Sequence, residues 1–389
     1  MKIEKLISTI VLTLTISLAF AQDINEKHST KINKKWSHVA TKMPTEWYGS
    51  KEAKLIAENV LLAQKEIGGW EKNTAYHLEF SESEKAKYLL KKKEKGGTFD
   101  NGATITELKF LAKVYSNSKD ERYKEAFIKG VNYIFKAQYK NGGWPQFFPV
   151  KDAADEIALD NTEPYSMHIT YNDDAMVNTM QFLKNIFTSN KEFNTLKLDD
   201  NIKLKAKNAF NMGIECILNT QIIVDNQPTI WCAQHNENTL APANARSYEL
   251  ASFSGSESVG ILLLLMDIEK PSKKIIASIN GAIKWFETHK IEGIKIETET
   301  QVDGKRNRIV VKDENAPILW ARFYDLETEK PYFCDRDGIK KNSLAEIGHN
   351  RRNGYSWYTN RPEEALKKHK EWLWKRICYS DLLDYFIVN

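Results

Sequence analysis

The residues best suited to chemistry stand in two short stretches of similar composition, TFDNGAT (98–104) and ITYNDDA (169–175). Each stretch precedes a helical pattern and offers more side-chain oxygens than one helix cap needs. The oxygen-bearing residues are Asp100, Asn101, Asn172, Asp173 and Asp174. Capping is the simpler interpretation of either stretch alone, but two equivalent stretches favour a site for a hard cation such as calcium, which prefers several oxygen ligands. We expect Asp100-Asn101 and Asp173-Asp174 to lie at matching points of one rim, with Asp174 capping its helix.

Three arginines add the opposite charge. Arg246 stands in ANARSYELASFSGSES, and Arg322 and Arg336 stand among aromatic residues in PILWARFYDLETEKPYFCDRDG. A guanidinium beside aromatic rings is suited to bidentate binding of a sugar acid. For Arg322 and Arg336 the alternative is a buried arginine paired with an aspartate of the same stretch. Carboxylates, a cation and arginines on one rim would together suit a carboxylated substrate.

Other catalytic patterns are missing from the sequence. His168 and His235 lie in no HExxH, and no GxSxG nucleophile motif accompanies them, so we expect structural histidines. There is neither a GxGxxG nor a GxxxxGK[ST] motif, which leaves nucleotide binding without support.

A repeat organises the elements that must position these residues. Three segments share an apolar helical face, a Gln, a turn and a Trp, and the tryptophans are Trp70, Trp144 and Trp231. We expect these rings to pack in the core. After the first two, an amphipathic helix follows TFDNGAT and ITYNDDA, and Thr104 with Glu107 makes a capping-box pattern in the first.

The repeat predicts a mainly α fold, an α/α toroid (an incomplete α/α barrel of about three helical-hairpin repeats) with short β-hairpins and long irregular loops. Alternating β-branched residues in 290–311 predict a hairpin around Asp303-Gly304. A last helix is expected in the stretch that begins at Glu363.

The N-terminal sequence and the composition indicate the cellular location and the number of domains. Residues 1–21 have the charged start, apolar run and small-residue end of a signal peptide, which predicts a secreted or periplasmic protein. Residues 22–389 are expected to form a single catalytic domain with its core at about 50–375, acting as a monomer. No later apolar run is long enough to span a membrane. The net charge of +4 among 389 residues is too small to indicate nucleic-acid binding.

The motifs resemble those of the pectate lyases of polysaccharide lyase family 10. The resemblance runs in order from about residue 68 to 358, and the matching stretches are GGWEKN, GGTFDNGATITE, AQYKNGGWPQFFP, HITYNDDAM, IWCAQH, ARSYELASFSGSES, PILWARFYDLET, FCDRDG and RRNGYSWY. The resemblance implies a toroidal helical enzyme that cleaves polygalacturonate by calcium-assisted β-elimination to unsaturated oligogalacturonides.

The resemblance also implies roles for individual residues. Asp173 would bind calcium against the substrate carboxylate, and Asp100 and Asn101 would lie at the metal and the substrate. Arg246 would be the base that takes the C5 proton. The substrate would be gripped by Arg322 and Arg336.

Two other functions stay open from the residues alone. One is an α/α-toroid glycoside hydrolase that uses a pair of carboxyl groups drawn from Asp100, Asp173 and Asp174. The other is a non-catalytic protein that binds pectin oligosaccharides.

Overall fold

The computed structural model describes residues 34–150 and 164–387, with side chains up to Arg376. The predicted signal peptide lies outside these residues. Among the residues described, no helix is both long enough and apolar enough to cross a membrane.

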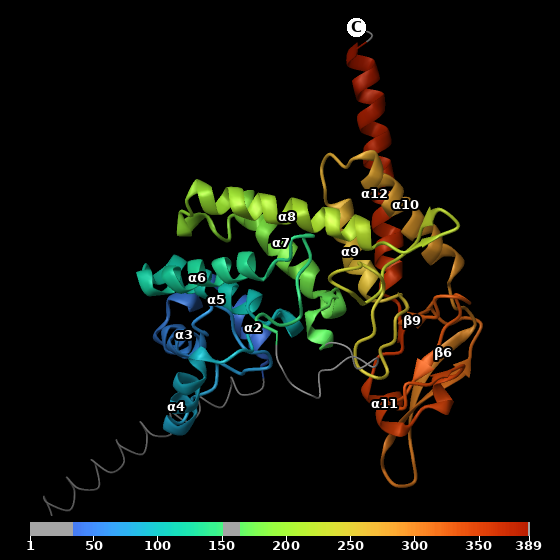
Figure 1. Cartoon of the computed structure of the whole chain (residues 1–389), viewed down its shortest axis with the longest axis horizontal. Helices are drawn as coiled ribbons and strands as arrows, with labels where there is room; N and C mark the ends of the chain where they lie inside the picture. The colour runs from blue at the N-terminus through green and yellow to red at the C-terminus, as the bar shows by residue number, and fades with distance from the viewer. Residues whose placement is uncertain (1–33, 151–163, 388–389) are drawn as a thin grey trace, which may run out of the picture.

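Paired helices form the framework of the molecule (Figure 1). They are α3 (Lys51–Ala63), α5 (Ile105–Ser118), α6 (Glu121–Ala137), α7 (Ala175–Phe187), α8 (Asp200–Thr220), α9 (Glu257–Met266) and α10 (Lys273–Thr288). Side chains of Ser50, Asp120, Asp199 and Ser272 accept hydrogen bonds from backbone N–H groups in the first turns of α3, α6, α8 and α10. These caps satisfy donors that the helix itself leaves free, so they fix where the helices begin.

The predicted repeat is present as a repeated set of hydrogen bonds. The Gln64 amide donates to the carbonyls of Gly68 and Ala126, both at 2.9 Å, and so links its own turn to the next helical pair. Gln138 and Gln221 each donate in the same way to one turn carbonyl and one carbonyl of a later helix. Each glutamine thereby ties neighbouring repeats together through buried backbone groups.

The repeated tryptophans lie in the core, as predicted. Trp70, Trp144 and Trp231 are each 0% exposed, and each indole N–H donates to a carbonyl of the preceding helix. Trp320 makes the same kind of bond to Phe286, at 2.8 Å, and marks a further turn that the sequence pattern did not reveal. A buried Trp needs a partner for its N–H, and the repeat supplies one each time.

Strands are short except in one hairpin. β6 (Ile294–Thr300) pairs antiparallel with β7 (Arg306–Lys312) around the predicted Asp303-Gly304 turn. The remaining strands have two residues each: β1 (Ile169–Thr170), β2 (Ile223–Val224), β3 (Gln227–Pro228), β4 (Gln234–His235), β5 (Phe253–Ser254), β8 (Trp320–Ala321), β9 (Phe323–Tyr324), β10 (Phe333–Cys334), β11 (Lys340–Lys341) and β12 (Tyr358–Thr359).

Two pairings hold the later chain against the helical repeats. β9 pairs with β5, and β1 pairs with β4, so segments distant in sequence meet at the loops that precede α7 and α9. A second apolar cluster, centred on Phe323 and Trp357, lies under this region. Helices predominate in the described part of the chain, and each sheet there has two strands, which confirms the predicted α/α toroid class.

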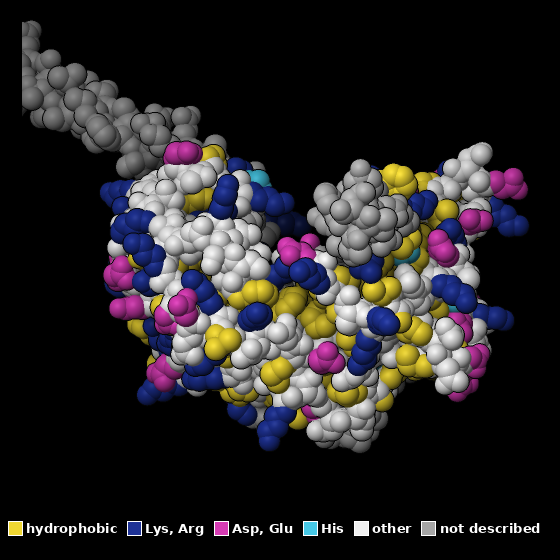
Figure 2. Space-filling view, turned by 90° about the horizontal axis from the view of Figure 1, so that it is seen from above, with side chains coloured by type: hydrophobic (Ala, Val, Ile, Leu, Met, Phe, Trp, Pro, Cys, Tyr) yellow, Lys and Arg dark blue, Asp and Glu magenta, His cyan; other side chains and the backbone are white. Residues whose placement is uncertain are grey.

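Three short α-helices, two 3-10 turns and one long helix also belong to the fold. They are α2 (Trp36–Thr41), α4 (Glu82–Leu90), α11 (His349–Gly354), the 3-10 turns η3 (Asp100–Gly102) and η6 (Asn172–Asp174), and the terminal α12 (Arg361–Ile387). The last helix was expected from the sequence, and it packs on α9 and α10. On the face drawn in Figure 2, Lys and Arg side chains are scattered among fewer Asp and Glu side chains, and hydrophobic side chains gather near its centre.

The capping box predicted for α5 is wrong. Thr104 occupies the N-cap position with φ +66° and makes no side-chain cap bond. Its hydroxyl instead donates to the Thr98 carbonyl at 2.8 Å, while Glu107 accepts a bond from the Trp36 indole at 2.6 Å. Tertiary partners have taken both side chains that local sequence would assign to the cap.

Candidate active site

The two predicted oxygen-rich turns have the same backbone shape. Asn101 in η3 has φ 52° and ψ 28°, and Asp173 in η6 has φ 51° and ψ 33°. Such left-handed conformations are rare outside Gly, and Asn and Asp tolerate them best. The match pairs Asn101 with Asp173 and Asp100 with Asn172, so the predicted correspondence was one residue out of step. The first turn therefore carries one carboxylate, Asp100, and the second carries two, Asp173 and Asp174, at different positions.

Asp173 is the accessible carboxylate of the two turns. Its side chain is 45% exposed, and one oxygen lies 3.7 Å from the Arg322 guanidinium. Partial burial raises the pKa of Asp173; Arg322 lowers it, and the nearby carboxylates, Glu257 first, raise it again. A cation bound beside these carboxylates would therefore stabilise the ionised form of Asp173.

Arg322 is buried beneath this turn rather than free in solvent. It forms an ion pair with Glu257 at the start of α9 and donates to the Asn172 side chain at 3.2 Å. The face of Tyr355 lies 4.6 Å from its guanidinium carbon. Arg322 is thus a buried arginine paired with a carboxylate, which was the alternative predicted for it. Its partner, however, is Glu257 and not an aspartate of its own stretch.

The first turn lies beside the second and is neutralised differently. Asp100 is 4% exposed and forms an ion pair with Lys72. Asn101 points outward, and its amide donates to Asn73 at 3.1 Å. The contacts between η3 and η6 place Asp100 and Asp173 on one rim, as predicted.

Asp174 does not cap its helix, contrary to expectation. It stands at the N-cap of α7 with φ 57° but makes no side-chain cap bond. Its carboxylate accepts a hydrogen bond from Arg361 at 2.8 Å, which joins this turn to the first turn of α12. Burial raises the pKa of Asp174, and Arg361 acts against that shift.

Arg246 is held by a buried carboxylate of its own loop. Its guanidinium donates through two nitrogens to Glu249, whose side chain is 7% exposed, while Arg246 itself is 45% exposed. Tyr355 donates to the same carboxylate at 2.7 Å. Burial alone would lower the pKa of Arg246, but the bonds to Glu249 outweigh it and raise that pKa.

Glu249 connects Arg246 to the Asp173 turn. Glu249 and Asn172 line the same small internal pocket, and the charge of Glu249 acts on Asp173. The guanidinium carbon of Arg351 lies 4.4 Å from the centre of the Tyr248 ring, and that of Arg246 lies 5.0 Å from the same centre. Two guanidinium groups therefore contact this one ring.

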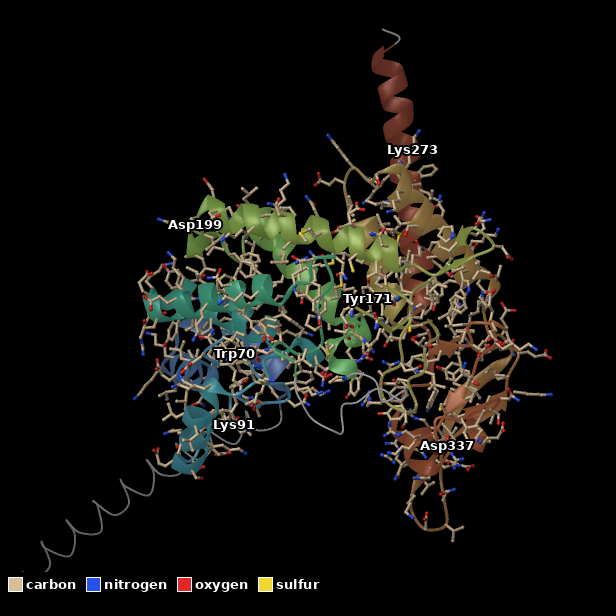
Figure 3. All side chains as sticks on the ribbon, in the orientation of Figure 1. Trp70, Lys91, Tyr171, Asp199, Lys273 and Asp337 are labelled. Atoms are coloured by element: carbon tan, nitrogen blue, oxygen red, sulfur yellow. The ribbon has the colours of Figure 1, made fainter. Side chains whose placement is uncertain are left out.

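Arg336 lies apart from these residues. It sits on the exposed turn between β10 and β11 and lines a separate surface hollow with Gln301 and His349. In Figure 3 the neighbouring Asp337 marks this turn, which is well separated from Tyr171 beside the Asp173 turn. The structure thus gathers five of the six predicted site residues and leaves Arg336 outside.

The two histidines have structural partners, as expected. His168 lies 3.2 Å from the Glu237 carboxylate, and His235 accepts from the Cys232 N–H and contacts the Leu240 carbonyl. Burial lowers the pKa of His235 to about 4.

The donor set suits a hard cation that is shared with a ligand. Among the residues described, no group of three or more His, Cys, Asp or Glu could hold a metal ion alone. Asp173 and Asp100 do supply carboxylate oxygens on one rim, and an accessible carboxylate in an acidic cluster fits calcium better than a softer metal. Further oxygens would have to come from substrate or water.

Sequence reasoning missed the residues that hold the site together. Glu249 stands three positions after Arg246, and Glu257 opens the third repeat helix, so a search for carboxylates near the arginines could have found both. Tyr355 and Arg361 carry no such signal, because only the fold brings them to the rim.

Comparison with known proteins agrees with this geometry. A family model described as pectic acid lyase matches residues 64–366. A family 10 polysaccharide lyase from Cellvibrio cellulosa is 32% identical, with a TM-score of 0.69 over 84% of this chain and 94% of that one. A mutant of that lyase in complex with trigalacturonic acid matches equally well, over 95% of its chain. No curated protein sequence matches significantly.

Proposed function

The chain belongs to the pectic acid lyase family and is a polysaccharide lyase, and we propose that it cleaves polygalacturonate by calcium-assisted β-elimination. The observation that carries the proposal is the rim on which accessible Asp173 lies beside Asp100, with Arg322 beneath and Arg246 linked through Glu249. The trigalacturonic acid bound by the similar Cellvibrio lyase supports an acidic polysaccharide as substrate.

In this proposal Asp173 and Asp100 hold calcium against a uronate carboxylate. Bound calcium would stabilise the negative charge that develops on that carboxylate when C5 loses its proton. Arg322 keeps the Asp173 turn in place, since it pairs with Glu257 and bonds to Asn172 at the same time. Asn101, exposed on the same rim, would contact the sugar hydroxyls.

Arg246 is the proposed base for the C5 proton. Its position is fixed by the buried Glu249, but that same pair favours the protonated form of Arg246. For the base to act, nearby cations must offset this effect in the substrate complex. Arg351, over the same tyrosine ring, and calcium at Asp173 would both act in that direction. The elimination then breaks the C4–O4 bond and leaves a C4–C5 double bond.

The proposal also includes export. The signal-peptide pattern of residues 1–21 would carry the enzyme out of the cytoplasm. Polymeric pectin is found outside the cell, so export would bring the enzyme to its substrate.

The test is turnover of polygalacturonate, followed by the ultraviolet absorbance of the unsaturated product. Chelation should abolish it and calcium restore it. Arg246→Ala should lower kcat by about a thousandfold, the range for loss of a general base. Arg122→Ala is a matched control. Arg122 also pairs with a glutamate, Glu58, but Arg122 lies on α6, away from the rim. Saturated products only would instead support hydrolysis by the carboxyl groups.

A further inference from the structure

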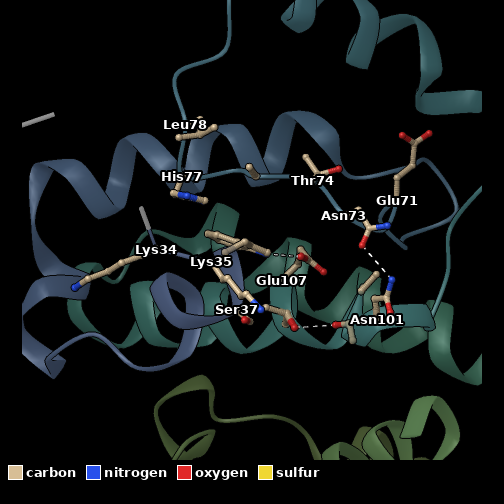
Figure 4. Close-up of a pocket in the computed structure, with 15 residues that line it drawn as sticks. Lys34, Lys35, Ser37, Glu71, Asn73, Thr74, His77, Leu78, Asn101 and Glu107 are labelled. Carbon is tan, nitrogen blue, oxygen red and sulfur yellow. Dashed lines mark hydrogen bonds between the residues drawn. The ribbon is translucent and has the colours of Figure 1, made fainter. Parts of the chain in front are cut away.

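A pocket of about 470 Å³ adjoins the rim and has no role in the proposed chemistry. One wall is the segment 71–78, and the other is η3 with the first turn of α5 (Figure 4). Residues 34–37 close one end. The pocket therefore lies between the start of the described chain and the first oxygen-rich turn.

Asn101 belongs both to this pocket and to the rim of the candidate active site. It lines the pocket and follows Asp100 directly in the chain, and its amide is bonded to Asn73 on the opposite wall. A substrate chain that passes from the rim over Asn101 would therefore meet this wall.

Buried polar atoms without partners line the pocket. Glu107 is 2% exposed; its Oε1 accepts from Trp36, but its Oε2 has no hydrogen-bond partner among the described residues. The Nδ1 atom of His77 is likewise buried and makes no hydrogen bond of normal geometry, although the Lys34 backbone lies close enough to act on the ring. Unsatisfied buried polar atoms are costly, and a hydroxyl-bearing ligand could supply the missing bonds.

The other lining groups indicate the class of ligand. Trp36 and His77 present flat rings that are nearly parallel, with 7° between their planes. The hydroxyls of Thr74 and Thr106 add further hydrogen-bonding groups. Lys35 stands at the end of the pocket, whereas the Lys34 ammonium is directed away from it toward Met43 Sδ, 4.0 Å away. Flat rings, hydroxyls, amide groups and one cation suit an acidic sugar.

We infer that this pocket binds a further galacturonate unit of the substrate chain, beyond the units held at the Asp173 turn. This inference rests on the proposed function, since it names where a longer substrate would continue. It makes the enzyme favour longer chains, because each additional occupied unit adds binding energy.

The test compares a trimer and a heptamer of galacturonate. Asn73→Asp adds a negative charge to an exposed position in the pocket without changing side-chain size, so kcat/KM should fall more on the heptamer than on the trimer, by about fivefold. Asn226→Asp is the matched control, because Asn226 is also exposed, also has positive φ (62° against 61°) and lies in the β2–β3 turn.

A second variant tests the same pocket by volume. Ser37→Trp would fill it from an exposed position of α2 and should again cost the heptamer more than the trimer. Equal losses on both substrates, or no loss in either variant, would overturn the inference.

Binding separates this inference from the proposed function. In an Arg246→Ala background with calcium present, calorimetric titration should show that Asn73→Asp weakens the heptamer selectively. If the wild-type enzyme cleaves no galacturonan, the proposed function fails, yet this titration still decides whether the pocket binds the longer chain.

Discussion

The turns before α5 and α7 share a backbone and differ in what they can do. At residues 72 positions apart, Asp100 corresponds to Asn172 and Asn101 to Asp173. The first turn buries Asp100 against Lys72, whereas the second exposes Asp173 above Arg322. The repeated backbone thus places an aspartate at a buried position in one turn and at an exposed position in the other.

The helices that follow differ at one buried position. Glu107 in α5 corresponds to Thr179 in α7; both are buried, but Thr179 bonds to the Ala175 carbonyl one turn back, at 2.9 Å. Glu107 instead reaches Trp36, which belongs to no repeat. The first repeat therefore contacts the N-terminal part of the chain through Glu107, and this contact helps to form the pocket. The second repeat has no carboxyl group at the corresponding position.

The largest effect should come from the exposed carboxylate. Asp173→Asn makes the second turn resemble the first at this position and should lower kcat/KM on polygalacturonate by more than about a hundredfold, because it would remove the proposed calcium ligand. Asp225→Asn is the control, since Asp225 is another exposed aspartate with positive φ (48°), in the β2–β3 turn. Near-normal activity of Asp173→Asn would show that the two turns do not differ in function.

Glu107 should make stability depend on pH. Burial raises the pKa of Glu107 to about 7, so the folded protein holds this proton more tightly than the unfolded chain does. Folding is therefore favoured at low pH, and stability falls as pH rises from about 4.5 to about 7. Glu107→Gln should remove about 2 kcal/mol of that fall.

Urea unfolding at pH 5 and pH 8 measures this effect. Glu269→Gln serves as the control, because Glu269 is exposed. An identical pH dependence of stability in wild type and Glu107→Gln would contradict the prediction. Glu107 would then contribute no more to the pH dependence of stability than the uncharged Thr179 at the corresponding position of α7.

The smallest effect should follow a change at Asp174. Asp174→Asn keeps the size of the side chain and removes the ion pair with Arg361, which is partly exposed, so it should cost about 1 kcal/mol of stability. Activity of the folded protein should stay within about threefold, because Asp174 bonds away from Asp173. A loss of activity as large as that of Asp173→Asn would contradict this division of roles.

Much of the helical framework followed from sequence pattern. The Gln and Trp repeat, the β6–β7 hairpin and the last helix were all visible, because apolar spacing and turn residues act locally. The failures were also local. Thr104, Glu107 and Asp174 have cap-like sequences, but their side chains bond to Trp70, Trp36 and Arg361, which are distant in sequence. Local capping propensity is overridden where the same side chain can form a different hydrogen bond in the folded protein.

The sequence alone determined which residue types recur, and hence the helical repeat and the acidic turns that carry Asp100 and Asp173. Only the tertiary structure decided how those turns differ. Arg322 found its partner Glu257 65 residues away, and Arg361 reached Asp174 across 187 residues. Such pairs form because buried charges must be compensated by whatever the fold brings near, and no local spacing encodes that choice.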